Sequence, residues 1–396
     1  MHEGPRASIY VHFPYCLEKC PYCDFVSYKT ERTAIDHAAY ADAVLAELDA
    51  RAPAFQGRAV ASVFFGGGTP SLWDPRQLGR VLRAIRAMTT SDLEVTVECN
   101  PTSLDAARAA ALAEAGVNRL SIGVQSLRDE ELAFLGRLHD ARGALEAVRA
   151  ALASPIPRVS ADLIFGLPDQ APAEAARQAG ALADLGLFHL SCYQLTIEPR
   201  TRFGELAKRG RLPLADDGAV AEAFLAVEEA LGARGLRHYE ISNYAREGEE
   251  ARHNLGYWRG EEYLGLGCGA FGFTRVDGSA AGGTSRAPGV RNAGVRWRNQ
   301  ILPETYVQNA HDPTMEREEL DAAALLRERI MLGLRVAEGL DLAAAGHELG
   351  VDPMTPERAR TIAALVARGR LQVDGGRLRI PPRAWLFADD TAARLF

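Results

Sequence analysis

The chain has 396 residues, of which 47% are hydrophobic and 24% charged, and its formal net charge is −7. This composition is typical of a folded globular protein, and the acidic balance with interspersed arginines excludes a broad basic surface for nucleic acid. No run of about 20 apolar residues predicts a membrane span and no secretory signal is recognisable, so we expect a soluble, cytoplasmic protein.

From about residue 8 to residue 244, short apolar or β-branched runs alternate with helical stretches. The predicted strands are residues 9–13, 60–65, 94–98, 119–124, 158–165 and 190–197, with a further one at 238–241. The predicted helices include residues 40–50, 75–88, 104–115, 141–153 and 219–233. Repeated strand–helix units form parallel sheets with right-handed crossovers. We therefore predict an α/β fold in which residues 1–245 form a partial (β/α)6 barrel.

The pattern changes after residue 245. Residues 246–315 are rich in glycine, with Gly265, Gly267, Gly269 and Gly272 close together and a loose run from Gly278 to Gly289, which predicts a loop-rich connector. Residues 316–396 return to helical periodicity at 320–334 and 356–367, followed by a strand–turn–strand signature at 371–380. We predict a small winged-helix-like α+β domain here. Because it has no basic stripe, we expect a structural or interaction module without nucleic-acid contacts.

Three of the six cysteines, Cys16, Cys20 and Cys23, lie within eight residues, directly after the first predicted strand. The other three, Cys99, Cys192 and Cys268, stand alone in apolar or glycine-rich runs and are expected to be small buried residues. Three thiolates can hold a [4Fe–4S] cluster and leave one iron without a protein ligand. The amino and carboxylate groups of S-adenosylmethionine (SAM) can chelate such an open iron. The rival interpretation is a structural zinc site, for which His12 is the nearby fourth candidate.

The spacing of the triplet, three and then two residues between cysteines, resembles the radical SAM superfamily. Further segments extend the resemblance over nearly the whole chain: GGGTP at 66–70, ECNP at 98–101, RLSIGVQS at 119–126, DLIFGLP at 162–168 and HNLGYW at 253–258. They are similar to the branch that contains oxygen-independent coproporphyrinogen III dehydrogenases and related haem chaperones. The resemblance implies a partial barrel that binds a [4Fe–4S] cluster on Cys16, Cys20 and Cys23, with SAM beside it.

The resemblance also implies which residues hold SAM. These are Tyr10, Tyr22, Gly67, Gly68, Thr69, Glu98, Gln125, Arg137 and Asp162. Several of them are polar residues in or beside apolar strands, where burial is costly unless a hydrogen-bond partner is present. Ribose and ammonium groups are such partners. The alternatives are a tight turn for the glycines, a solvated helix end for Arg137 and a core position for Tyr10.

A haem site is the second implication. His253 is followed by the aromatic pair Tyr257 and Trp258, and a neutral imidazole is a common axial ligand of haem iron. On the residues alone, a single histidine is more often structural. The resemblance to haem chaperones makes His253 a candidate ligand for haem carried as cargo.

Two departures separate this sequence from the coproporphyrinogen dehydrogenases. In those enzymes a further cysteine follows the third after one residue, where this chain has Phe25, and an extension precedes the first strand, which here is predicted to begin at about Ser8. We therefore expect a haem chaperone that delivers haem to a recipient haemoprotein, for example one of a respiratory complex at the membrane face. Radical decarboxylation of a coproporphyrinogen propionate is the alternative, and a zinc-stabilised interaction protein is a third. A homodimer and a peripheral membrane contact are compatible with the sequence, which leaves open whether SAM is cleaved.

Overall fold

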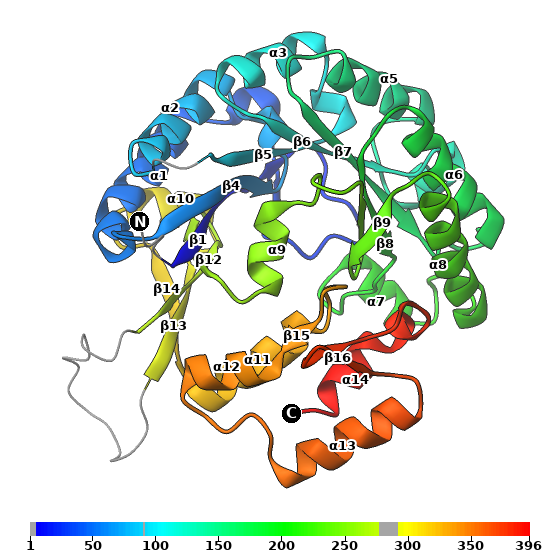
Figure 1. Ribbon diagram of the computed structural model, residues 1–396. Coiled ribbons are helices and arrows are strands. Elements are labelled where there is room, and N and C mark those ends of the chain that lie inside the picture. Colours follow the sequence, from blue (N-terminus) through cyan, green and yellow to red (C-terminus); the bar gives the residue numbers. More distant parts are fainter. Residues whose placement is uncertain (1–4, 90–91, 277–291) are drawn as a thin grey trace.

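The computed structural model describes residues 5–89, 92–276 and 292–396 (Figure 1). In these residues twelve strands form one large sheet in the order β14-β13-β12-β11-β1-β4-β5-β6-β7-β8-β10-β9. The strands from β1 to β8 in this order are parallel neighbours, and helices cover their outer side along the arc seen in Figure 1. The predicted α/β partial barrel is confirmed.

The six parallel strands agree with the predicted ones to within a few residues. They are β1 (Arg6–Phe13), β4 (Ala59–Gly67), β5 (Glu94–Cys99), β6 (Arg119–Gln125), β7 (Arg158–Phe165) and β8 (His189–Gln194). The covering helices are α1 (His37–Arg51), α2 (Pro75–Arg86), α3 (Ala106–Glu114), α5 (Ala141–Leu152), α6 (Pro172–Asp184) and α8 (Asp217–Gly232). Side chains of Asp36, Asp74, Asp105 and Asp140 accept hydrogen bonds from free backbone N–H groups at the starts of four of these helices.

Burial of both faces shows that these strands lie between two layers. In β5, Val95 and Val97 are completely buried on one face and Thr96 between them is completely buried on the other, as expected for a parallel strand covered on both faces. The predicted strand at 238–241 is β9 (Arg237–Glu240), which pairs antiparallel with β10 (Asn243–Ala245) at one edge of the sheet.

The prediction of a loop-rich connector is wrong for much of residues 246–315. This segment contains α9 (Arg252–Trp258), β11 (Glu262–Leu266), β12 (Phe271–Arg275), β13 (Asn292–Asn299) and α10 (Pro303–Gln308). β11 is parallel to β1, and β12 and β13 continue the sheet in antiparallel fashion. The run from Gly278 to Gly289 lies outside the described residues. Among the described glycines of this segment, Gly265 and Gly272 have a packing role.

Two glycines show why the pattern was misleading. A Cβ atom on Gly265 would lie 1.8 Å from the carbonyl oxygen of Phe271, and one on Gly272 would lie 2.0 Å from the ring of Trp297. These positions are glycine because another strand or an indole ring packs directly on the backbone. Glycine in a sequence does not distinguish such close packing from a loop.

The C-terminal part contains α11 (Ala322–Gly333), α12 (Leu342–Leu349), α13 (Pro356–Ala367) and α14 (Ala388–Ala393), with a small sheet of β15 (Leu340–Asp341), β17 (Arg377–Arg379) and β16 (Gln372–Asp374). The predicted strand–turn–strand is the β16–β17 hairpin, whose turn glycines Gly375 and Gly376 have positive φ. The predicted border at residue 316 falls inside β14 (Thr314–Asp321), which belongs to the large sheet.

A buried carboxylate joins the added strands to the barrel. Glu47 of α1 is completely buried and accepts hydrogen bonds from Gly267 N (2.9 Å), Tyr306 Oη (2.8 Å) and Asn299 Nδ2 (2.7 Å). Arg51 Nε lies 2.8 Å from Oε1 of Glu47. Because four donors converge on it, this charge is compensated despite its burial.

Glu47→Gln is expected to lower the free energy of unfolding by about 1–3 kcal/mol, because the amide removes the charge and leaves at least one buried donor without an acceptor. Urea titration followed by circular dichroism measures the change. Asp49→Asn, on the exposed side of the same helix, is the control and should be close to neutral. Equal stability of both variants would contradict the role of Glu47.

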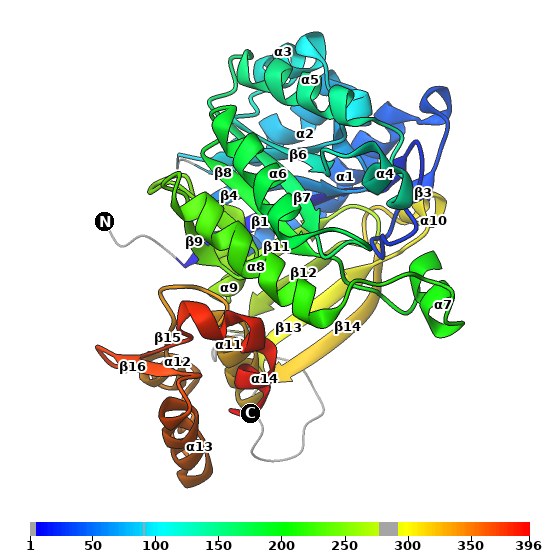
Figure 2. The ribbon, with the colours of Figure 1, turned by 90° about the vertical axis from the view of Figure 1, so that its right-hand side faces the viewer.

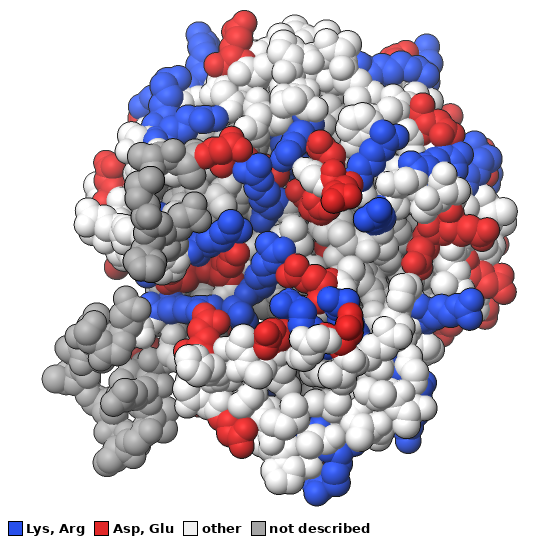
Figure 3. All heavy atoms as spheres, viewed as in Figure 1, with Lys and Arg blue, Asp and Glu red and all other residues white. Residues whose placement is uncertain are grey.

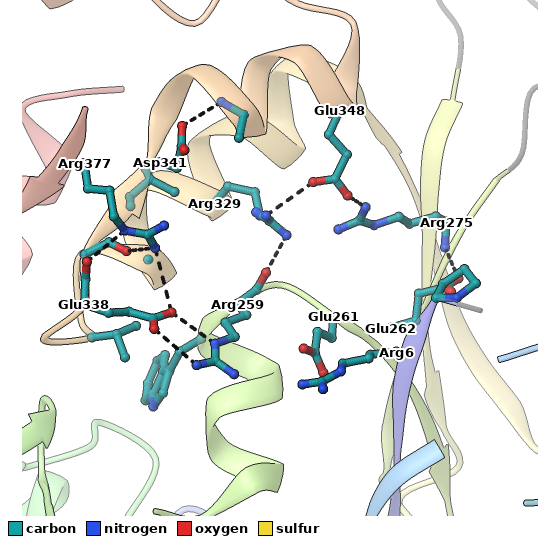
Figure 4. Close-up of a pocket in the computed structure, with 17 residues that line it drawn as sticks. Arg6, Arg259, Glu261, Glu262, Arg275, Arg329, Glu338, Asp341, Glu348 and Arg377 are labelled. Carbon is teal, nitrogen blue, oxygen red and sulfur yellow. Dashed lines mark hydrogen bonds and ion pairs between the residues drawn. The ribbon is translucent and has the colours of Figure 1, made fainter. Parts of the chain in front are cut away.

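The C-terminal domain contacts the barrel across a charged cleft of about 480 Å³, which we call the interdomain cleft (Figure 4). Arg259 Nε lies 3.1 Å from Glu338, and Arg329 Nη2 lies 3.3 Å from Glu348, which also pairs with Arg275. Arg259, Arg275 and Arg329 are thus each paired with a carboxylate of the same cleft. These ion pairs stabilise the contact between the barrel and the C-terminal domain.

Charges of both signs are interspersed over the face in Figure 3. The described residues include no helix long and apolar enough to cross a bilayer.

Candidate functional site

A cavity of about 410 Å³ lies at the carboxyl ends of the parallel strands, which we call the strand-end cavity. In β/α barrels this edge is where ligands bind. It is lined by every predicted cluster and SAM residue except Tyr10: Cys16, Cys20, Cys23, Tyr22, Gly67, Gly68, Thr69, Glu98, Gln125, Arg137 and Asp162. Residues far apart in the sequence are therefore brought together as the motifs predict.

The three cysteines lie on the segment that follows β1. Cys16 ends the short strand β2 (Tyr15–Cys16), which pairs with β3 (Tyr28–Lys29), and its thiol is buried. Thr69 Oγ1 donates to Cys16 Sγ (3.3 Å), and Arg137 Nη1 donates to Cys20 Sγ (3.5 Å). Burial raises the pKa of Cys16 to about 11. Binding of iron must therefore supply the positive charge that keeps this sulfur as a thiolate.

Among the described residues, no group of three His, Cys, Asp or Glu side chains is placed to hold a single metal ion. A four-iron cluster does not require such convergence, since each thiolate ligates a different iron. His12, the candidate fourth zinc ligand, has both ring nitrogens hydrogen-bonded, Nδ1 to Tyr10 Oη (3.0 Å) and Nε2 to the carbonyl of Val26 (2.7 Å).

The glycine turn after β4 lies directly against the cysteine segment. Gly67 has φ +106°, and a Cβ atom there would lie 2.4 Å from His12 Cε1. A Cβ on Gly68 would lie 2.8 Å from the carbonyl oxygen of Phe13. The backbone can approach this closely only because both residues lack side chains. Gly67 N donates to Glu98 Oε2 (3.1 Å), which connects the turn with the end of β5.

Gly67→Ala is expected to destabilise the protein by about 2 kcal/mol or more, since it adds a clash to an unfavourable φ. Gly186→Ala is the matched control, because Gly186 has φ +97° but open space around its Cβ position. It should cost only about 1 kcal/mol. Urea denaturation of both variants measures the difference, and equal costs would show that the contact with His12 is unimportant.

Two partly buried carboxyl groups, those of Glu98 and Asp162, face the cavity. Burial and the nearby Asp162 raise the pKa of Glu98 to about 8. Burial also raises the pKa of Asp162, against the effect of hydrogen bonds from Ser191 and Ser121, whose Oγ donates to Asp162 Oδ1 (3.1 Å). Arg119 and Arg137 lie close enough to Asp162 to act against this rise in its pKa. Both carboxyl groups can accept hydrogen bonds from a ligand that carries hydroxyl or ammonium groups.

Gln125 and Arg137 add unpaired polar atoms. Gln125, at the irregular carboxyl end of β6, has φ 69°, a strained conformation for a residue other than glycine. In the described part of the chain its buried Oε1 and the Nε of Arg137 lack hydrogen-bond partners. Arg137 Nη2 donates to the carbonyl of Gly123 (2.8 Å), so this guanidinium is a fixed wall of the cavity. The orphaned atoms fit a polar ligand such as SAM.

Comparisons with known proteins agree with this geometry. The family model described as the radical SAM superfamily matches residues 10–178, and the model of the HemN C-terminal domain matches residues 320–387. Over 392 residues the chain is 34% identical to the heme chaperone HemW of Mycobacterium tuberculosis, covering 98% of this chain and 94% of that protein. The chain belongs to the radical SAM superfamily, in its HemN/HemW branch. Its cofactors are accordingly a [4Fe–4S] cluster and SAM.

Two further relatives match a smaller share of the chain, and one solved structure matches all of it. It is 42% identical over 275 residues to the heme chaperone HemW of Escherichia coli (69% of this chain, 71% of that protein). It is 39% identical over 340 residues to the mitochondrial radical S-adenosyl methionine domain-containing protein 1 of Bos taurus (85% and 74%). The solved structure of coproporphyrinogen III oxidase (HemN) from Escherichia coli covers the whole chain and 91% of its own, with a TM-score of 0.80. At 21% identity it supports the fold alone.

Tyr10 does not line the strand-end cavity of this radical SAM protein. Its hydroxyl is hydrogen-bonded to His12, and its ring stacks on Phe64 with centroids 6.3 Å apart. The side chain of Tyr10 is partly buried and lies near Glu98, which lines the cavity. A contact between Tyr10 and SAM stays a prediction.

His253 of this radical SAM protein is in the core. Its side chain lies in α9, which the arc of strands encloses (Figure 1), and is 1% exposed. Nδ1 is hydrogen-bonded to Ser62 Oγ (3.0 Å) and Nε2 to Tyr257 Oη (3.2 Å). Burial lowers the pKa of His253 to about 3, so the ring is neutral. Ligation of haem by His253 would require the ring to give up a hydrogen bond and open the core around it.

Sequence reasoning did not assign Ser121 and Ser191, which hold Asp162, nor Tyr193, which lines the strand-end cavity. Ser121 lies in the RLSIGVQS segment, and its inward orientation follows from alternation with the buried Leu120 and Ile122. That signal was available. For Ser191 and Tyr193, the sequence does not indicate which strand carries the neighbouring carboxylate.

Proposed function

We propose that this chain binds haem and delivers it to a recipient haemoprotein. The observation that carries the proposal is the full-length similarity to the heme chaperone of Mycobacterium tuberculosis, which includes the cysteine segment, the barrel and the C-terminal domain. A relationship that spans both domains supports a shared overall task better than a match to the barrel alone, which serves many chemistries.

We further propose the roles of the residues in the strand-end cavity. Cys16, Cys20 and Cys23 would hold the cluster, with Tyr22 and Thr69 beside it. Glu98, Gln125, Arg137 and Asp162 would bind the polar groups of SAM, which Gly67 and Gly68 let approach the backbone. Cluster and SAM together supply one-electron chemistry when bound. The protein side chains orient SAM and, through the apolar core below, limit access of water.

Phe25 favours the chaperone over the alternative of coproporphyrinogen decarboxylation. It lines the strand-end cavity at the position where the dehydrogenases carry a further cysteine, and 59% of its surface is exposed. A phenyl ring has neither the acidic proton nor the redox chemistry of a thiol. Such an exposed ring at a cavity entrance is suited to contact a ligand or a partner instead.

Anaerobic titration of haem into cluster-loaded protein, followed by the Soret absorbance, tests the proposal. Saturable binding at one haem per chain, and transfer of that haem to an apo-haemoprotein, are the expected results. Incubation with coproporphyrinogen, SAM and a reductant is the parallel test of the alternative. Formation of protoporphyrinogen, or absence of saturable haem binding, would contradict a chaperone that carries haem only.

The place of action belongs to the same proposal. We expect the chain to act in the cytoplasm and to meet its recipient there or at the membrane face, where a respiratory complex is a suitable recipient. A homodimer and a peripheral membrane contact are tested by light scattering and by co-sedimentation with anionic vesicles. Neither alters the haem titration.

A further inference from the structure

A second cavity, of about 710 Å³, shares Glu18, Lys19, Cys20 and Cys23 of the cysteine segment with the strand-end cavity; we call it the loop cavity. Its walls come from the cysteine segment, α4 (Asp129–Phe134) and α7 (Arg202–Lys208), which lie at the same end of the barrel in Figure 2. Phe203 N donates to the carbonyl of Pro21 (2.9 Å), and the rings of Phe203 and Phe134 lie 4.9 Å apart. The apolar walls are thus tied to the segment that carries the cluster ligands.

Three arginines surround this apolar cavity. Arg200, Arg202 and Arg211 line it and are exposed. In the described ranges, no carboxylate lies within ion-pair distance of any of the three, and none of their guanidinium groups donates a hydrogen bond to the protein. Glu18, which also lines the cavity, is paired with Lys29. Three positive charges are therefore left for a ligand.

Two other cavities lined by several arginines differ in this respect. In a cavity of about 280 Å³ beside Tyr257, Arg296 lies 2.7 Å from Glu328, and in the interdomain cleft Arg329 is paired with Glu348. An arginine already bound to a carboxylate must lose that partner before it can bind an anionic ligand. The loop cavity alone among these three combines apolar walls with open guanidinium groups.

We propose that the loop cavity binds the haem cargo, with the macrocycle between its apolar walls and the two propionates on Arg200, Arg202 and Arg211. The proposal rests on the proposed function and names its site. A cavity of this volume is within the range of small-molecule sites, and arginine is suited to bind carboxylates with two parallel hydrogen bonds. The partly exposed ring of Phe134 can pack against a flat macrocycle, and the buried ring of Phe203 supports it from behind.

The lining also suggests how the cargo is released. The residues described in this wall include no histidine, methionine or tyrosine, and its cysteines, Cys20 and Cys23, are the proposed ligands of the cluster. Haem held by its propionates and ring faces would keep its iron open. A recipient could then attach its own axial ligand before the macrocycle leaves.

The test uses anaerobic, cluster-loaded full chain and compares haem, metal-free protoporphyrin and haem dimethyl ester. Wild type is expected to bind haem and protoporphyrin with similar affinity and the ester at least about tenfold more weakly, since the ester lacks the charges that the arginines bind. The double variant Arg202→Gln, Arg211→Gln should lose about tenfold or more for haem and little for the ester. Arg209→Gln, on the same segment but paired with Glu205, is the control and should bind as wild type does.

Iron content and thermal unfolding verify that each variant is folded and loaded. Leu206→Trp, which fills the cavity, is a second, uncharged variant and should also weaken binding. If wild type does not bind haem saturably, the proposed function fails and this inference with it. If wild type binds haem but the arginine and Leu206 variants bind equally well, or only His253→Ala abolishes binding, the proposed function stands and the loop cavity is not the site.

Discussion

Cys20→Ser is expected to leave the chain without its [4Fe–4S] cluster after anaerobic reconstitution, whereas wild type should contain close to four irons and four sulfides per chain. Three thiolates already leave one iron without a protein ligand, and a serine hydroxyl is a poor substitute for a thiolate. With only Cys16 and Cys23, two irons would depend on external ligands. Iron and sulfide analysis, together with the visible absorbance of the cluster, measures the loss.

Two matched cysteine variants sharpen this test. Cys192 lies in β8 and is 3% exposed, and Cys192→Ala should retain full iron content. This control distinguishes loss of a cluster ligand from loss of any buried thiol. Cys99 lines the strand-end cavity as well, so Cys99→Ala tests whether this thiol is a ligand. Full iron content in Cys20→Ser would refute the assignment, and loss of iron in Cys99→Ala would add a ligand to it.

Glu98→Gln is expected to stabilise the SAM-free protein increasingly as the pH rises, and to weaken SAM binding. The ordinary pKa of a glutamate is 4.5, and in the folded protein the pKa of Glu98 is about 8. Between these values the unfolded chain has released the proton while the folded chain keeps it, so wild-type stability falls with rising pH. The difference of 3.5 pH units corresponds to an upper limit of about 5 kcal/mol, which is reached above pH 8.

Urea denaturation at pH 5 and pH 9 measures this effect. The stability difference between Glu98→Gln and wild type should be larger at pH 9 than at pH 5, because glutamine cannot ionise. Glu114→Gln, at an exposed position at the end of α3, is the control and should follow wild type at both pH values. A parallel pH dependence of wild type and Glu98→Gln would mean that another group, such as Asp162, is responsible.

Much of the barrel and its polar lining was predictable from the sequence. Short segments rich in apolar and β-branched residues, such as that of β4, predicted the strands. The carboxyl ends of parallel strands share one edge, so Glu98, Gln125 and Asp162 had to lie near one another. The cysteine spacing indicated a cluster with an open iron. These features depend on local pattern and on topology, which a sequence specifies.

Features that depend on which surfaces meet were not predictable. Gly265 and Gly272 are consistent with loops until Phe271 and Trp297 are seen to pack against them. The motif around His253 does not reveal that Ser62 and Tyr257 occupy both ring nitrogens. In the same way, Arg200, Arg202 and Arg211 are ordinary surface charges in the sequence. Only the structure, in which Phe203 N is hydrogen-bonded to the carbonyl of Pro21, shows that they line one cavity with the cysteine segment.

The junction between the large sheet and the C-terminal domain has a mechanical consequence. β14 ends at Asp321, and the same residue accepts a hydrogen bond from Ala324 N (2.7 Å) as the N-cap of α11, so no flexible residue separates sheet from helix. A force that a bound partner exerts on α11 would therefore be transmitted through β14 toward β1, from which the cysteine segment leaves. We therefore expect a displacement of α11 to move β14 with it, because no hinge between the two elements can absorb the motion.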